Sequence, residues 1–157
     1  MSSQAPGPDN PPKAQAASSQ TPIQAAKAPV LAYNDKNWQL LRSVVPPDFV
    51  YEEVATQRRL EGIDAVFACW QGWAKAFPDS KATFDAEFVS GGTVVLEVTW
   101  CGTHTGPLDL PGGPVAPTNR EIRLQGCQVI ALRNGQAQSI RQYFDIATLL
   151  HQLGMLP

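Results

Sequence analysis

The chain has 157 residues, a length that predicts a single domain with room for a sizeable core. Its formal net charge of −2, without any block of like charges, argues against a nucleic-acid surface, which needs clustered Lys and Arg. No apolar run approaches the roughly 18 residues of a membrane span, and the first residues lack the basic and apolar regions of a signal peptide. We therefore expect a soluble cytoplasmic protein that binds neither nucleic acid nor membrane.

The first part of the chain differs in composition from the rest. Residues 1–29 are almost entirely Ser, Gln, Ala, Pro and Gly, and after Met1 their one large apolar side chain is Ile23. Such a segment buries too little apolar area to offset the entropy of ordering it. We predict a disordered tail over 1–29, with 23–27 as at most a frayed helical turn, and a folded domain over 30–157.

Helical and extended patterns alternate at the start of this domain. Asp35 can cap a short helix over 36–45, and a strand is predicted over 48–54, followed by a polar connection around 58–61. The clearest helical periodicity runs over 62–77, where aromatic and aliphatic residues form one stripe that ends at Pro78.

The second half of the domain is dominated by strands. Alternating patterns predict strands over 82–88, 93–104, 121–133 and 136–144, with glycine-containing turns at Gly91-Gly92 and Asn134-Gly135 and a closing helix from Asp145 to Gly154. The Pro- and Gly-rich segment over 107–117 is either a binding loop or a tolerated insertion. Helices followed by hairpin-connected strands predict an α+β domain whose curved antiparallel sheet closes a cone over the helices.

His104 stands out at the end of an otherwise apolar strand. It shares the parity of Trp100, Val98 and Leu96, so its imidazole is expected on the buried face. A buried imidazole needs a carboxylate, a carbonyl or a ligand as partner, and a core histidine satisfied by a neighbour is the alternative.

The three cysteines, Cys69, Cys101 and Cys127, are an odd number at scattered positions. This pattern favours buried free thiols over a disulfide framework, and no metal site is expected.

Several short motifs together resemble the SnoaL-like polyketide cyclase family, often labelled ester cyclases. They span roughly Val30 to Leu156: Phe77-Pro78-Asp79, Gly102-Thr-His-Thr-Gly106, Asn134-Gly135 and Tyr143-Phe-Asp145 with Gln152-Leu-Gly154. The resemblance implies the cystatin-like, cone-shaped α+β barrel shared with ketosteroid isomerase and nuclear transport factor. It further implies a deep apolar pocket and assembly as a homodimer or a larger homo-oligomer.

The resemblance also implies catalytic residues. The family's cyclases close a ring by aldol chemistry without metal or cofactor, using an aspartate that corresponds in position to Asp145; a role as helix cap alone is the alternative. A family histidine that stabilises the enolate falls at Val129 to Ala131 here, where no side chain can donate a hydrogen bond. His104 or Gln128 could take its place, although neither matches that position.

Other residues are candidates for binding a ligand. Tyr51, Trp70 and Trp100 supply aromatic surface for a flat ring system, although most such residues are simply core. Asn34 matches a polar position that often faces the pocket in this family, and a turn-capping role would explain it equally well. Tyr143 shares the parity of Asp145, at either a pocket mouth or an oligomer surface.

The leading hypothesis is a cofactor-independent cyclase or isomerase that acts by proton transfer on an apolar carbonyl compound. Asp145 would be the base, and His104 would polarise the oxygen on which charge develops. The alternatives are a non-catalytic module that binds an apolar small molecule in the same cone, and a protein-assembly domain.

Overall fold

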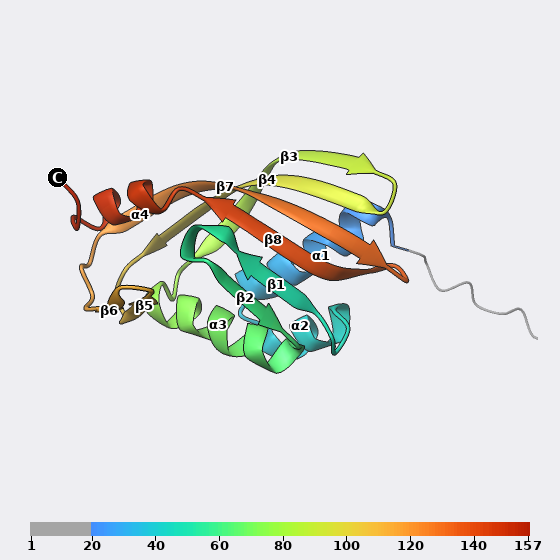
Figure 1. The fold of residues 1–157 in the computed structure, drawn as a ribbon, viewed down its shortest axis with the longest axis horizontal. Helices are drawn as coiled ribbons and strands as arrows, with labels where there is room; N and C mark the ends of the chain where they lie inside the picture. Colours follow the sequence, from blue (N-terminus) through green and yellow to red (C-terminus); the bar gives the residue numbers. More distant parts are fainter. Residues whose placement is uncertain (1–19) are drawn as a thin grey trace, which may run out of the picture.

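The computed structural model describes residues 20–157. The part of the predicted disordered tail over 1–19 lies outside the described residues. Within residues 20–157, helices and strands alternate and then give way to long strands (Figure 1). The helices are α1 (Pro22–Asn34), α2 (Trp38–Val44), α3 (Ile63–Ala76) and α4 (Ile146–Gln152), with a 3-10 turn η1 (Val54–Thr56). The strands are β1 (Val50–Glu53), β2 (Arg58–Glu61), β3 (Lys81–Ser90), β4 (Thr93–Thr103), β5 (Leu108–Leu110), β6 (Gly113–Val115), β7 (Glu121–Arg133) and β8 (Gln136–Phe144).

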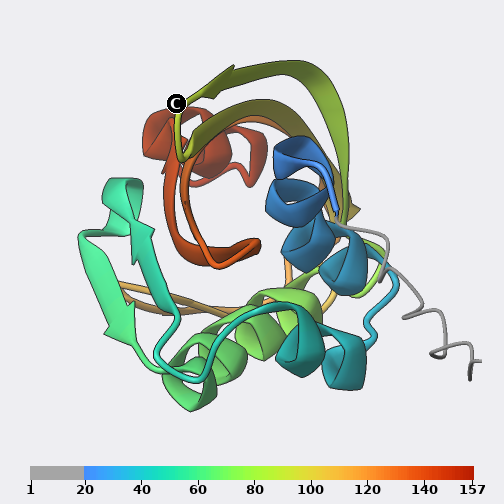
Figure 2. The same ribbon diagram turned by 90° about the vertical axis from the view of Figure 1, so that its right-hand side faces the viewer.

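One curved sheet encloses the helices. Its six strands follow the order β2-β1-β8-β7-β4-β3, and they curl around α1 and α3 when viewed along the cone (Figure 2). The sheet is mixed and not purely antiparallel, because β1 pairs parallel to β8. The predicted α+β cone is confirmed, with this one parallel pair as a refinement.

The start of the domain lies earlier than predicted. Thr21 caps α1 in a reciprocal capping box with Gln24, and Pro22 occupies the first turn, where its missing N–H costs nothing. Ala25 and Ala26 are fully buried, so residues 22–29 belong to the folded domain. The prediction was wrong because this helix is rich in alanine, as a disordered tail can be. Small alanine side chains allow the helix to approach the sheet closely.

Two further segments carry more structure than predicted. The polar connection around 58–61 is the edge strand β2, whose backbone pairs with β1 while its side chains alternate between half-buried and exposed. The segment over 107–117 contains the hairpin β5–β6, and Leu108 at its start is buried. A short edge strand needs only backbone pairing, so it leaves no apolar alternation in the sequence.

The core consists of two neighbouring clusters. The larger cluster fills the concave face of the sheet beneath α1, α2 and α3, with Trp70 near its centre. The smaller one joins the end of α3 to β5, β7 and α4 through residues such as Phe77, Leu108 and Leu149. Trp100 packs against both clusters. None of the helices within residues 20–157 is long and apolar enough to cross a membrane.

The contact between α3 and the segment after β4 predicts a strong effect at Gly106. The backbone N–H groups of Thr105 and Gly106 both donate to the Ala76 carbonyl, and a Cβ at Gly106 would collide with the Lys75 carbonyl oxygen. We expect Gly106→Ala to lower the free energy of unfolding by about 1–3 kcal/mol, as overpacking does. Urea denaturation measures this. Gly112→Ala is the control, because a Cβ there meets no atom within 4 Å, and equal effects of both substitutions would contradict the prediction.

Candidate active site

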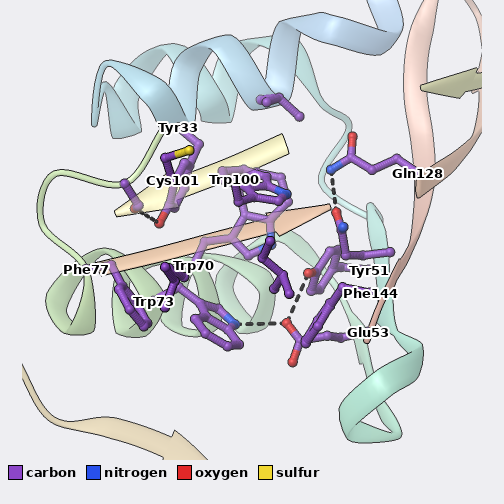
Figure 3. A pocket seen from close by; sticks show the side chains of 15 residues that line it. Tyr33, Tyr51, Glu53, Trp70, Trp73, Phe77, Trp100, Cys101, Gln128 and Phe144 are labelled. Carbon is purple, nitrogen blue, oxygen red and sulfur yellow. Dashed lines mark hydrogen bonds between the residues drawn. The ribbon is translucent and has the colours of Figure 1, made fainter. Parts of the chain in front are cut away.

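A cavity of about 80 Å³ lies between the two core clusters, on the concave side of the sheet (Figure 3). Most of its wall is aromatic or aliphatic, and a few polar groups interrupt it. The aromatic side chains of the wall are Tyr33, Tyr51, Trp70, Trp73, Trp100, Phe77 and Phe144. The polar ones include Glu53, Ser80, Gln128 and Gln142.

Glu53 brings a carboxylate into this cavity. Its side chain is 1% exposed, and its two oxygens accept hydrogen bonds from Tyr51 Oη (3.1 Å), Trp73 Nε1 (2.8 Å) and Thr56 Oγ1 (2.5 Å). Figure 3 shows the first two converging on one oxygen. Among residues 20–157 no ion pair involves Glu53, and its hydrogen-bond donors are uncharged: two hydroxyl groups and one indole N–H. A carboxylate has about four acceptor sites, and three are occupied here, which leaves one unoccupied.

Burial keeps the tyrosines of the cavity protonated. Burial and the adjacent Glu53 carboxylate raise the pKa of Tyr51 well above its usual value, so its hydroxyl remains a donor. Burial likewise raises the pKa of Tyr33 to about 12. Tyr33 Oη and Ser80 Oγ lie 2.7 Å apart, and one hydroxyl donates to the other. The pair therefore retains a second hydroxyl proton that can be donated to a ligand.

Two glutamines form the remaining polar part of the wall. Gln128 is buried, and its Nε2 donates to Gln142 Oε1 at 2.6 Å. The cavity thus combines a carboxylate, a spare hydroxyl proton and an amide pair within aromatic surroundings. Within residues 20–157 no group of three or more His, Cys, Asp or Glu side chains could hold a metal ion.

His104 lies outside the cavity wall, beside Phe77 of the smaller core cluster. It is fully buried and stacks on Phe77, with ring centroids 5.1 Å apart. Its Nδ1 accepts the Thr118 backbone N–H at 3.2 Å and lies 3.0 Å from the Thr118 hydroxyl. Because Nδ1 is an acceptor, the neutral ring carries its proton on Nε2, which has no hydrogen-bond partner among the described residues. Burial lowers the pKa of His104.

Asp145 also lies apart from the cavity, on the outer side of the sheet. It caps α4, accepting from the backbone N–H groups of Ala147 and Thr148. The Thr148 hydroxyl and these amides lower the pKa of Asp145, which favours the ionised form. Asp145 and Tyr143 line a second hollow together with Glu97. The structure therefore brings neither of the two predicted catalytic residues into the cavity.

The predicted ligand-binding residues divide into two groups. Tyr51, Trp70, Trp100 and Gln128 lie in the cavity wall. Asn34 instead joins α1 to β3, because its amide bonds both the N–H and the carbonyl of Ala82. Tyr143 is 40% exposed on the outer hollow.

The structure also adds residues that the sequence reasoning missed, chiefly Glu53, Tyr33 and Ser80. A signal for Glu53 was present, because alternation along the predicted 48–54 strand places Glu53 on the same face as Phe49 and Tyr51.

The thiols are also placed differently from the prediction. All three cysteines are free, but Cys101 is exposed and Cys69 and Cys127 are only half-buried. Cys101 is exposed because alternation along β4 sets it on the parity opposite to Trp100.

Comparison with known proteins identifies the family. A model of the SnoaL-like polyketide cyclase family matches residues 23–153. The chain belongs to this family. The match confirms the resemblance seen in the sequence and extends it to α1. Among curated proteins, none has significant similarity to this SnoaL-like chain.

Solved structures share the SnoaL-like fold at low sequence identity. IdmH from Streptomyces antibioticus, a proposed polyketide cyclase, is 24% identical with a TM-score of 0.72, over 86% of this chain and 99% of IdmH. TsrD from Streptomyces laurentii is 23% identical with a TM-score of 0.72, over 85% and 95% of the two chains. A protein with a ketosteroid isomerase-like fold from Catenulispora acidiphila, in complex with trimethylamine, is 17% identical with a TM-score of 0.70, over 85% and 94%.

The buried imidazole predicts a pH dependence of stability. Because the folded-state pKa of His104 is lowered, the unfolded chain binds a proton at higher pH than the folded chain does. The contribution of neutral His104 to the free energy of unfolding is therefore complete above the unfolded-state pKa of about 6.5 and is lost as the pH falls toward the folded-state pKa. The free energy of unfolding then changes by at most about 1.4 kcal/mol per pH unit. Urea denaturation between about pH 7.5 and pH 5 measures this slope. We expect His104→Gln to reduce it and His151→Gln, at the exposed second histidine, to preserve it. An unchanged slope in His104→Gln would contradict the prediction.

Proposed function

We propose that this SnoaL-like protein is an enzyme of the cyclase or isomerase type, which uses side-chain groups alone to transfer a proton on an apolar carbonyl compound in the cavity. The observation that carries the proposal is Glu53, a carboxylate that lines an aromatic cavity and is removed from water. A desolvated carboxylate with a free acceptor site is suited to general-base catalysis. Glu53 thereby takes the role that the family resemblance implied for Asp145.

The roles follow from the positions of the polar groups. Glu53 removes a proton from the carbon next to the carbonyl, and the electron pair of that C–H bond forms an enolate. The spare hydroxyl proton of the Tyr33–Ser80 pair hydrogen-bonds the enolate oxygen as charge develops there. Returning the proton from Glu53 to another carbon of a conjugated enolate completes an isomerisation. In an aldol cyclisation the enolate carbon bonds to a second carbonyl carbon, and the alkoxide formed there takes the proton back from Glu53.

The rest of the cavity supports this chemistry. Tyr51, Thr56 and Trp73 fix the orientation of the Glu53 carboxylate, so little reorganisation is needed when the substrate binds. The aromatic walls provide surface for a flat apolar skeleton. IdmH is a proposed polyketide cyclase, and the Catenulispora acidiphila protein has a ketosteroid isomerase-like fold. Both descriptions are consistent with proton-transfer chemistry.

Proton exchange in heavy water tests the proposal. The probe is 1-tetralone, an apolar bicyclic ketone with acidic hydrogens next to its carbonyl, followed by NMR. We expect the protein to catalyse the exchange of these hydrogens and Glu53→Gln to slow it by about 100-fold or more, since a positioned general base contributes about 10²–10⁴. Circular dichroism verifies that the variant is folded.

Two control variants separate the candidate bases. Glu52→Gln changes the neighbouring carboxylate, which faces outward toward Arg59, and should retain full exchange. Asp145→Asn should also retain it. Loss of exchange in Asp145→Asn with retention in Glu53→Gln would return the role of base to Asp145. Binding of the ketone without exchange in the wild-type protein would favour a non-catalytic binding module.

A further inference from the structure

Glu53 has a cationic neighbour on the inner face of the sheet. In the antiparallel pair of β1 and β2, Glu53 lies directly opposite Arg58. Opposite residues of such a pair point to the same face, with Cβ atoms about 5 Å apart. Arg58 is half-buried, whereas the next residue, Arg59, is exposed and forms ion pairs with Glu52 and Glu61. Alternation along β2 therefore directs one arginine toward the inside of the cone and the other toward solvent.

Uncharged groups hold the guanidinium of Arg58 in place. Its Nη1 donates to Cys69 Sγ in α3 at 3.0 Å, and its Nη2 donates to the Asp109 carbonyl in β5 at 3.3 Å. Both β2 and β5 pack against α3 (Figure 1). No carboxylate within residues 20–157 forms an ion pair with Arg58. The positive charge is therefore fixed in position but is not neutralised by direct contact.

One face of α3 meets both charged side chains. Cys69, which accepts from Arg58, and Trp73, which donates to Glu53, are four residues apart in this helix. Residues at this spacing are neighbours on one helix face, about 5–6 Å apart. The guanidinium and the carboxylate are thus held beside consecutive turns of α3. They are beyond contact distance, but opposite charges interact over such a separation when they are partly removed from water.

The other side chains around Glu53 are neutral. Those without a titratable group come from η1, α3 and β8, and they are Thr56, Trp73 and Gln142. Burial raises the pKa of Tyr51 and the pKa of Cys69, so both stay protonated at neutral pH. Burial by itself would lower the pKa of Arg58, but the Cys69 sulfur and the Glu53 charge raise it above its ordinary value. Arg58 therefore remains a cation and supplies the positive charge that these neighbours lack.

We propose that Arg58 is a positioning residue for the proton transfer: from the neighbouring strand, its charge favours the ionised Glu53 carboxylate and so determines how far the pH can fall before the base is lost. This inference rests on the proposed function and adds the control of its base. Arg58 does not line the cavity and exchanges no proton itself. Glu53 takes the substrate proton and returns it, while the guanidinium stays charged throughout. The alternative is a purely structural role, in which Arg58 only ties β5 to α3.

The pH dependence of exchange tests the inference. Exchange of the acidic hydrogens of 1-tetralone is followed by NMR between about pH 4 and pH 8, which spans the ordinary titration of a glutamate. We expect Arg58→Gln to move the acid side of the profile toward higher pH by at least about 0.5 unit, since a cation in direct contact gives about 1–3 units. Arg58→Lys keeps the charge but loses the planar fork, so its profile should stay at the wild-type position. Arg59→Gln removes the outward charge and is the matched control, with an unchanged profile.

The pattern across these variants separates the charge of Arg58 from its structural contacts. No shift in folded Arg58→Gln would overturn the inference. An equal shift in Arg58→Gln and Arg58→Lys would also overturn it, because the lost contacts and not the lost charge would then be responsible. If Arg58→Gln does not fold, Arg58→Lys decides: a wild-type profile supports the inference, and a shifted profile overturns it.

A double-mutant cycle tests the same pair of residues without any substrate. Urea denaturation at neutral pH compares the effect of Arg58→Gln in the wild-type chain with its effect in Glu53→Gln. We expect Arg58→Gln to raise the equilibrium constant of unfolding at least about threefold more when Glu53 is present, because only then is an attraction between charges lost. Equal effects in the two backgrounds would overturn the pairing.

The two measurements separate this inference from the proposed function. Coupling in the cycle without any exchange by the wild-type protein would support the pairing of Arg58 with Glu53 and overturn the proton-transfer function. Exchange by the wild-type protein, with neither coupling nor a shift of the pH profile, would do the reverse.

Discussion

The packing of α3 into the concave face of the sheet is the contact on which the rest of the structure depends. Trp70, on the buried stripe of α3, meets the edges of Tyr33, Phe49 and Tyr51, with ring centroids 5.4–6.3 Å apart. These contacts join α1, α3 and β1 around one side chain. Tyr33, Tyr51 and Trp70 also line the cavity, so the same contacts shape its wall.

The same packing explains why a carboxylate can be buried there. Removing Glu53 from water would be prohibitive without compensation. Tyr51, Trp73 and η1 each direct a donor at it, so secondary structure and aromatic side chains together provide the polar environment. The tyrosine hydroxyl and the indole N–H serve two purposes, because their rings form the apolar wall while their polar atoms stabilise the charge.

Much of the fold could be predicted from local pattern. The stripe of α3, the Asn134-Gly135 hairpin and the long β4 and β7 strands lie where periodicity and turn chemistry indicated. The failures were α1, where alanines and a proline resemble a tail, and β2, where backbone pairing alone defines the strand. For the site, aromatic composition led to Tyr51, Trp70 and Trp100. Motif position led to Asp145 and strand parity led to His104, and neither of these lies in the cavity wall.

The sequence by itself determined the order of α3 and the long strands, which faces of those strands are apolar, and the family. These properties depend on residues close together in the chain, through alternation, helical spacing and turn chemistry. Only the tertiary structure decided which polar groups share the cavity. Glu53, Ser80 and Gln128 come from separate segments of the chain. Strand β1 pairs in parallel with β8, which comes much later in the chain, and this pairing places Glu53 in one row with Gln142 and Gln128. Such a row is a product of strand register across the sheet, which no local pattern specifies.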